Sequence, residues 1–106
     1  MAKYLVQASY TVDGVKGVMK EGASSRKATI EKLIKSLGGT MEAFYFAFGE
    51  ADVYVLVDLP NNETVAALSM AVSVSGAVNL KTTVLMTVDE IDRATKITVN
   101  YRPPGA

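Results

Sequence analysis

The feature that most restricts the fold is a pair of strand-like segments in the middle of the chain, joined by a short turn. Residues 40–48 and 52–59 are rich in aromatic and β-branched residues, and Gly49 and Glu50 lie between them. Two such runs separated by a glycine-containing turn predict a β-hairpin. Because strand side chains alternate between faces, one apolar set should lie against helices. This set is Phe44, Phe46, Phe48, Val53, Val55, Val57 and Leu59.

The segment before the hairpin is expected to form a strand followed by helices, and the segment after it a helix followed by a strand and a last helix. The expected elements are strands at residues 3–10, 40–48, 52–59 and 78–86, a short helix at 11–21 that breaks at Gly22, and helices at 26–37, 63–75 and 87–96. Thr87 and Glu90 have the spacing of a capping box at the start of the last helix, and residues 97–106 should form an extended tail. The order βαββαβ predicts one α+β domain over residues 1–106, with a ferredoxin-like, four-stranded antiparallel sheet and helices on one face.

The other face of this sheet is left without helices. By alternation it contains Ala43, Tyr45, Ala47, Asp52, Tyr54, Leu56 and Asp58, with Leu5, Gln7 and Ser9 from the first strand and Asn79, Lys81, Thr83 and Leu85 from the fourth. This set is too apolar for a surface that faces only water, so we expect a second subunit to cover it, as in a dimeric α/β barrel. The alternative is a partly exposed sheet face with scattered apolar residues. The helix at 63–75 is apolar on nearly all sides, so its outer side should be covered by the C-terminal segment or by another subunit.

Composition excludes several classes of function. The chain has 11 basic and 11 acidic residues, and this neutral balance argues against binding to nucleic acid. It has no Cys and no His, which excludes a thiolate or a histidine base, and we expect no metal and no cofactor. The longest uncharged run, residues 64–80, is short for a membrane span, and no signal-peptide pattern is present. We therefore expect a soluble, cytoplasmic homo-oligomer, with a small molecule as a second partner and no membrane partner.

The chain also resembles a known family over almost its whole length. The resemblance is carried by YLVQASYT at residues 4–11, KEG at 20–22, EAFYFAFG at 42–49, KTT at 81–83 and YRPPG at 101–105. These segments resemble the GYD-domain family of small bacterial proteins. The resemblance implies a ferredoxin-like fold within the dimeric α/β-barrel group, and it implies no established activity.

The family's Gly-Tyr-Asp signature is altered in this chain. Gly49 and Asp52 match the signature, and Ala51 stands where the family has tyrosine. If that tyrosine lines a site in the family, the corresponding site here should be wider and should lack one hydroxyl group.

Two clusters are candidate binding or catalytic sites. The first, on the bare sheet face, is Gln7, Tyr45, Asp52, Tyr54, Lys81 and Thr83. A carboxylate beside two phenols can hold a proton or bind a hydroxyl, amide or cation. In the alternative interpretation, Asp52 ties the turn backbone and the tyrosines pack at a subunit interface. The second cluster is Tyr10, Lys20 and Arg26, although a solvated charged face explains Lys20 and Arg26 equally well.

Three functions remain open at this point. One is a small-molecule binding module, by analogy with other domains of this fold. Another is a metal-free enzyme, of the oxygenase or isomerase type, acting on an aromatic or quinone-like compound with Tyr45, Asp52 and Tyr54 as acid and base. The last is a structural or assembly protein. A pocket between sheets or under the first helix favours the first two functions, and a dry, filled interface favours the third.

The absence of Cys and His leads to a prediction about metals. Exhaustive treatment with EDTA should leave the melting temperature unchanged, because no tightly bound ion contributes to folding. The measurement is a thermal melt with and without chelator. A fall of many degrees would reveal a site built from oxygen ligands alone.

Overall fold

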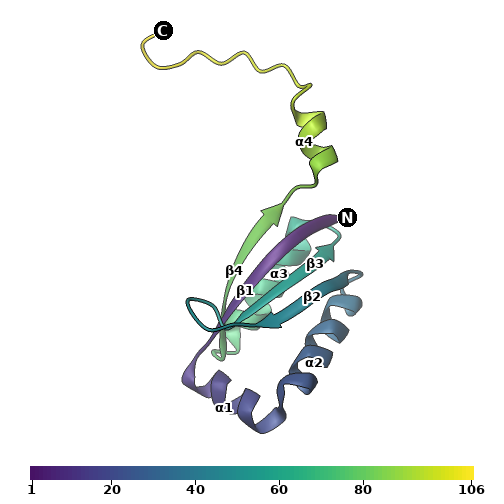
Figure 1. Ribbon diagram of the computed structural model, residues 1–106, viewed down its shortest axis with the longest axis vertical. Helices are drawn as coiled ribbons and strands as arrows, with labels where there is room; N and C mark the ends of the chain where they lie inside the picture. Colours follow the sequence, from purple (N-terminus) through teal and green to yellow (C-terminus); the bar gives the residue numbers. More distant parts are fainter.

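The computed structural model describes all 106 residues and confirms the ferredoxin-like fold. The elements are β1 (Ala2–Tyr10), α1 (Val12–Glu21), α2 (Ala23–Ser36), β2 (Thr40–Phe46), β3 (Val53–Leu59), α3 (Asn62–Val74), β4 (Val78–Leu85) and α4 (Val88–Ala94). The four strands form one antiparallel sheet in the order β2-β3-β1-β4. Helices α2 and α3 lie on the same side of this sheet (Figure 1).

The hydrophobic core lies between the sheet and these two helices. The strict alternation of β3 sends all four of its apolar residues at odd positions into the core. Tyr4, Val6 and Ala8 of β1 join them, and the helices contribute Ile34, Val65 and Leu68. The predicted division of the strands into a covered and a bare face is therefore confirmed, apart from the residues beyond the end of β2.

Helix boundaries follow from local hydrogen bonds. The Thr11 and Asn61 side chains accept hydrogen bonds from the first turns of α1 and α3, and the predicted capping box of Thr87 and Glu90 is present. Gly22 alone separates α1 from α2, with a φ of 94° that glycine adopts without strain. The predicted start of the second helix at residue 26 was wrong, because α2 begins at Ala23 directly after this glycine.

The hairpin connection is longer than the short turn at Gly49 and Glu50 that we predicted. Strand β2 ends at Phe46, and Phe48 is fully exposed instead of facing the helices. The Asp52 carbonyl accepts a hydrogen bond from the amide of Ala47, directly after β2, and the Asp52 amide donates to Ala8 of β1. The strand pairing of β2 with β3 ends at Phe46 and Val53, and residues 47–52 form a loop.

The C-terminal region departs furthest from expectation. It extends away from the domain as a yellow-green arm, so it does not cover the outer side of α3 within this chain (Figure 1). Met70 and Val74 on that side of α3 are exposed. Although α3 is apolar, none of the helices has both the length and the apolar character needed to cross a membrane.

Two glycines of α1 give a matched test of this packing. A Cβ atom on Gly14 would lie 2.1 Å from the Ala77 carbonyl oxygen, whereas one on Gly17 would meet nothing within 4 Å. Gly14→Ala should therefore lower the free energy of unfolding by about 1–3 kcal/mol through overpacking. Gly17→Ala should raise it by about 0.5–1 kcal/mol through helix propensity. Urea unfolding of both variants measures the difference, and equal effects would contradict the close approach at Gly14.

Candidate functional site

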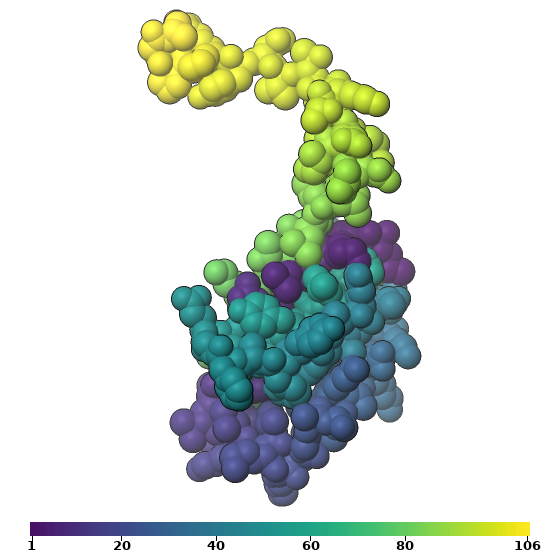
Figure 2. Space-filling view, viewed as in Figure 1, coloured from purple at the N-terminus to yellow at the C-terminus, as the bar shows by residue number.

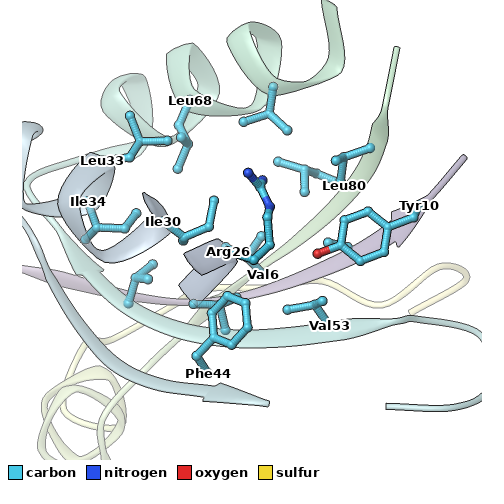
Figure 3. A pocket seen from close by; sticks show the side chains of 15 residues that line it. Val6, Tyr10, Arg26, Ile30, Leu33, Ile34, Phe44, Val53, Leu68 and Leu80 are labelled. Carbon is cyan, nitrogen blue, oxygen red and sulfur yellow. The ribbon is translucent and has the colours of Figure 1, made fainter. Parts of the chain in front are cut away.

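The covered side of the sheet contains a cavity between the strands and helices α2 and α3. Its volume is about 60 Å³, and 14 of its 15 lining residues are hydrophobic. Figure 3 shows these side chains arranged around the space. The lining residues are Val6, Ala8, Tyr10, Arg26, Ile30, Leu33, Ile34, Phe44, Val53, Val55, Val57, Leu68, Val72, Val78 and Leu80. A ligand group that fills such a space gains dispersion contacts with all of its walls.

A larger cavity adjoins this inner one beneath α1. Its volume is about 370 Å³, and half of its 14 lining residues are polar or glycine. The residues shared by the two linings are Tyr10, Arg26, Ile30, Leu33, Val72 and Val78. We call the two adjoining spaces the inner and outer cavities, and together the sheet–helix pocket.

The outer cavity owes part of its room to the two glycines of α1. Gly14 and Gly17 are three residues apart, which places them on one helical face, and both line the cavity. Asp13, Val18 and Glu21 of α1 line the same cavity, so the glycines leave gaps in a face that also carries side chains. The glycine spacing was the available signal in the sequence for such gaps.

Arg26 and Tyr10 lie where the two cavities meet. Arg26 is half-buried near the start of α2 and is the only charged residue that lines the inner cavity. In Figure 3 its side chain lies within the ring of apolar residues, and the Tyr10 hydroxyl points into the same region. The Arg26 guanidinium forms no ion pair, because the salt bridges of this chain all involve Lys3. Two members of the second predicted cluster are thus brought together, while Lys20 is exposed on α1 and lines neither cavity.

Four members of the first predicted cluster form one row across the bare face. Tyr45 of β2 pairs with Tyr54 of β3, Tyr54 with Gln7 of β1, and Gln7 with Lys81 of β4. Tyr45 is 70% exposed and Tyr54 36% exposed. The row therefore presents two aromatic rings to the outside of this chain, on the side of the sheet away from the pocket.

The other two members lie in neighbouring rows. Thr83 pairs with Leu5, in the row that also contains Leu56. Asp52 directly precedes the first residue of β3, and its carboxylate accepts a hydrogen bond from the Tyr10 amide at 2.8 Å. This bond, together with that from the Asp52 amide to Ala8, fastens the hairpin loop to the end of β1.

Charged groups at the opposite end of the bare face form ion pairs with one another. Lys3 of β1 forms ion pairs with Glu42 and Asp58, the latter at 3.2 Å. Hydrogen bonds to these two carboxylates raise the pKa of Lys3 above its ordinary value. No group of three or more His, Cys, Asp and Glu residues is placed to hold a metal ion.

The position of the altered family signature is also defined. Ala51 is 4% exposed. Ala51 lines neither the inner nor the outer cavity, so the wider site that we expected beside this residue is not part of the sheet–helix pocket.

The Asp52 contact gives a prediction about stability. Asp52→Ala should lower the free energy of unfolding by roughly 1–3 kcal/mol, because it leaves the half-buried Tyr10 amide without its charged acceptor. Asp52→Asn should cost less than half as much, because the amide oxygen still accepts. Urea unfolding measures both variants. Full stability of Asp52→Ala would show that the loop does not depend on this bond.

Comparison with known proteins gives a family match. No curated protein and no solved structure matches the chain. The family model described as GYD domain matches residues 4–95, which run from the second residue after the start of β1 to the end of α4. The match therefore includes the sheet apart from Ala2 and Lys3, all four helices and every residue that lines the pocket. On this basis the chain belongs to the GYD domain family.

Proposed function

We propose that this protein is an oligomeric small-molecule-binding module whose ligand occupies the sheet–helix pocket. The observation that carries the proposal is an apolar inner cavity that adjoins a larger outer cavity, with Arg26 and Tyr10 at their junction. Small-molecule sites combine mostly apolar walls with a few polar groups that orient the ligand. The outer cavity, at about 370 Å³, lies within the usual size range for such sites.

The lining indicates what kind of ligand fits. The inner cavity offers only apolar walls apart from Arg26 and the Tyr10 hydroxyl. A guanidinium without a protein carboxylate is best satisfied by a ligand carboxylate, which it binds through two parallel hydrogen bonds. The ligand therefore has an apolar body for the inner cavity and one carboxylate, or a similar anionic group, at Arg26.

The outer cavity limits the charge of this ligand. Asp13 and Glu21 of α1 line it, and the Glu21 carboxylate accepts a hydrogen bond from Ser25 at 3.0 Å. Two carboxylates at the rim repel a second anionic group on the ligand. A monoanion with a neutral remainder is consequently favoured over a dicarboxylate or a phosphate ester.

The bare face suits an interface better than the ligand site. Its tyrosine row presents two partly exposed aromatic rings and lies on the far side of the sheet from the pocket. An enzyme built on Tyr45, Asp52 and Tyr54 would need the Asp52 carboxylate as a base, and that group is engaged by the Tyr10 amide. We therefore assign the row Tyr45, Tyr54, Gln7 and Lys81 to contact with a second subunit.

Binding to a set of simple carboxylates tests the ligand proposal. Phenylacetate and octanoate should bind more tightly than their amides, phenylacetamide and octanamide, because only the acids pair with Arg26. Arg26→Gln should weaken carboxylate binding by about 10- to 100-fold, as expected for the loss of a charge-assisted hydrogen bond. Isothermal titration calorimetry measures both effects.

Two further variants serve as controls. Lys27→Gln removes a positive charge from the next residue of α2, which is exposed and lines neither cavity, so it should leave the affinity unchanged. Gly17→Leu places a side chain in the outer cavity and should weaken binding of the acid and the amide alike. The proposal fails if acids and amides bind equally, or if Arg26→Gln behaves like Lys27→Gln.

A further inference from the structure

The C-terminal arm, residues 86–106, leaves the domain at the end of β4 and does not return to it. Figures 1 and 2 show it extending well away from the sheet and the other helices. The Cα radius of gyration is 17.1 Å, whereas a compact chain of this length has a radius of about 13 Å. Helix α4 packs substantially against no other helix or strand.

One side of the arm is apolar. Val88 and Ile91 are three residues apart on α4, and both are exposed. After the helix, Ile97, Val99 and Tyr101 alternate with Thr98 and Asn100. The three apolar residues are each between 68% and 77% exposed. Alternation of β-forming residues is the pattern of a strand with one buried side, yet residues 98–101 belong to no strand in this chain.

The arm is poorly placed to fold back over its own sheet. Only Met86 and Thr87 lie between β4 and α4. The side chains of Thr87 and Glu90 fix the helix start through reciprocal hydrogen bonds of 3.0 and 3.1 Å. With this connection the helix continues onward from the strand, away from the sheet (Figure 1).

The bare sheet face is the second unpartnered apolar surface of the chain. Leu5, Leu56 and Leu85 lie on it beside the tyrosine pair. Its charges are partly satisfied within the chain, because Lys3 pairs with two carboxylates and Asp52 accepts from a backbone amide. Lys81 and Asp52 form no ion pair in the chain, and Lys3 with its two carboxylates keeps one excess negative charge. Burial of this face therefore carries a desolvation cost that its apolar contacts must exceed.

The proposed function already places a second subunit on the bare sheet face. We infer that the C-terminal arms are exchanged across this two-fold dimer. Each arm lies on the other copy, with Ile97, Val99 and Tyr101 turned towards it. A two-fold arrangement covers both unpartnered surfaces of both chains at once and closes without further copies. The net charge of zero means that two copies do not repel each other at long range. The inference deepens the oligomeric part of the proposed function and is independent of the ligand.

The alternation of the arm supplies a matched pair of variants. Ile97→Asp/Val99→Asp places two charges on the apolar side, and Thr98→Asp/Asn100→Asp places the same two charges on the opposite side. Sedimentation equilibrium should find the wild type dimeric at micromolar concentration. The first variant should raise the dimer dissociation constant by about 100-fold or more, as for loss of central interface contacts, and the second by only about 3-fold or less.

A substitution on the sheet face separates the two halves of the inference. Leu56→Lys should dissociate the dimer, and Ser24→Lys, which adds the same charge to an exposed position of α2, should not. Far-UV circular dichroism checks that each variant is folded, and the milder Ile97→Ala/Val99→Ala replaces the aspartate pair if that variant is not.

Each outcome decides the matter. Dissociation by the apolar-side arm variant and by Leu56→Lys, with both controls dimeric, supports arm exchange. A dimer that Leu56→Lys disrupts and the arm variants do not overturns arm exchange and leaves a simple sheet-to-sheet dimer. Equal effects of the two arm variants also overturn it. A monomeric wild type overturns arm exchange and the oligomeric part of the proposed function together, whereas failure of the ligand proposal appears only in the carboxylate titrations.

Discussion

The constraint on which the rest of this structure depends is that a β-sheet has two faces and this chain supplies helices for only one. The alternation of β3 buries Val53, Val55, Val57 and Leu59 against α2 and α3, and it necessarily sends Tyr54 and Leu56 to the other side. A register shift of one residue would expose the core. The need to bury the core residues therefore fixes which residues of each strand face the bare side. The domain therefore has an apolar sheet face that its own helices cannot reach.

The two faces have different consequences for function. On the covered face, small and β-branched strand residues leave an apolar space under the helices, and Gly14 and Gly17 of α1 line the adjoining outer cavity together with Asp13, Val18 and Glu21. Arg26 brings one positive charge to that space without a carboxylate to pair with it. On the bare face most charges pair with one another or with the backbone, and aromatic and aliphatic groups remain. The first arrangement suits a small anionic ligand and the second suits another protein surface.

The sequence was sufficient for those parts of the fold that periodicity encodes. The strands, their order, the two faces and the Thr87 capping box were predictable because each depends on local spacing of residue types. The loop at residues 47–52 was not, since its conformation depends on backbone hydrogen bonds of Asp52 to Ala8 of β1 and to Ala47. The pocket was predicted only in part: Tyr10 and Arg26 were candidate residues, but its volume depends on how far the helices stand from the sheet, which no local pattern records. The tail was predicted to be extended, but no local pattern says where an extended tail lies relative to the sheet.

The central claim, that the bare face and the arm are completed by a second copy, is tested most directly by the mass of the protein in solution. Small-angle X-ray scattering at micromolar to millimolar concentration gives this mass from the forward intensity. The radius of gyration alone would not decide, because a compact dimer has a radius of about 17 Å, close to the 17.1 Å of one chain with its arm extended. The account predicts twice the chain mass of 11.3 kDa. A mass equal to that of one chain across the whole concentration range would contradict it.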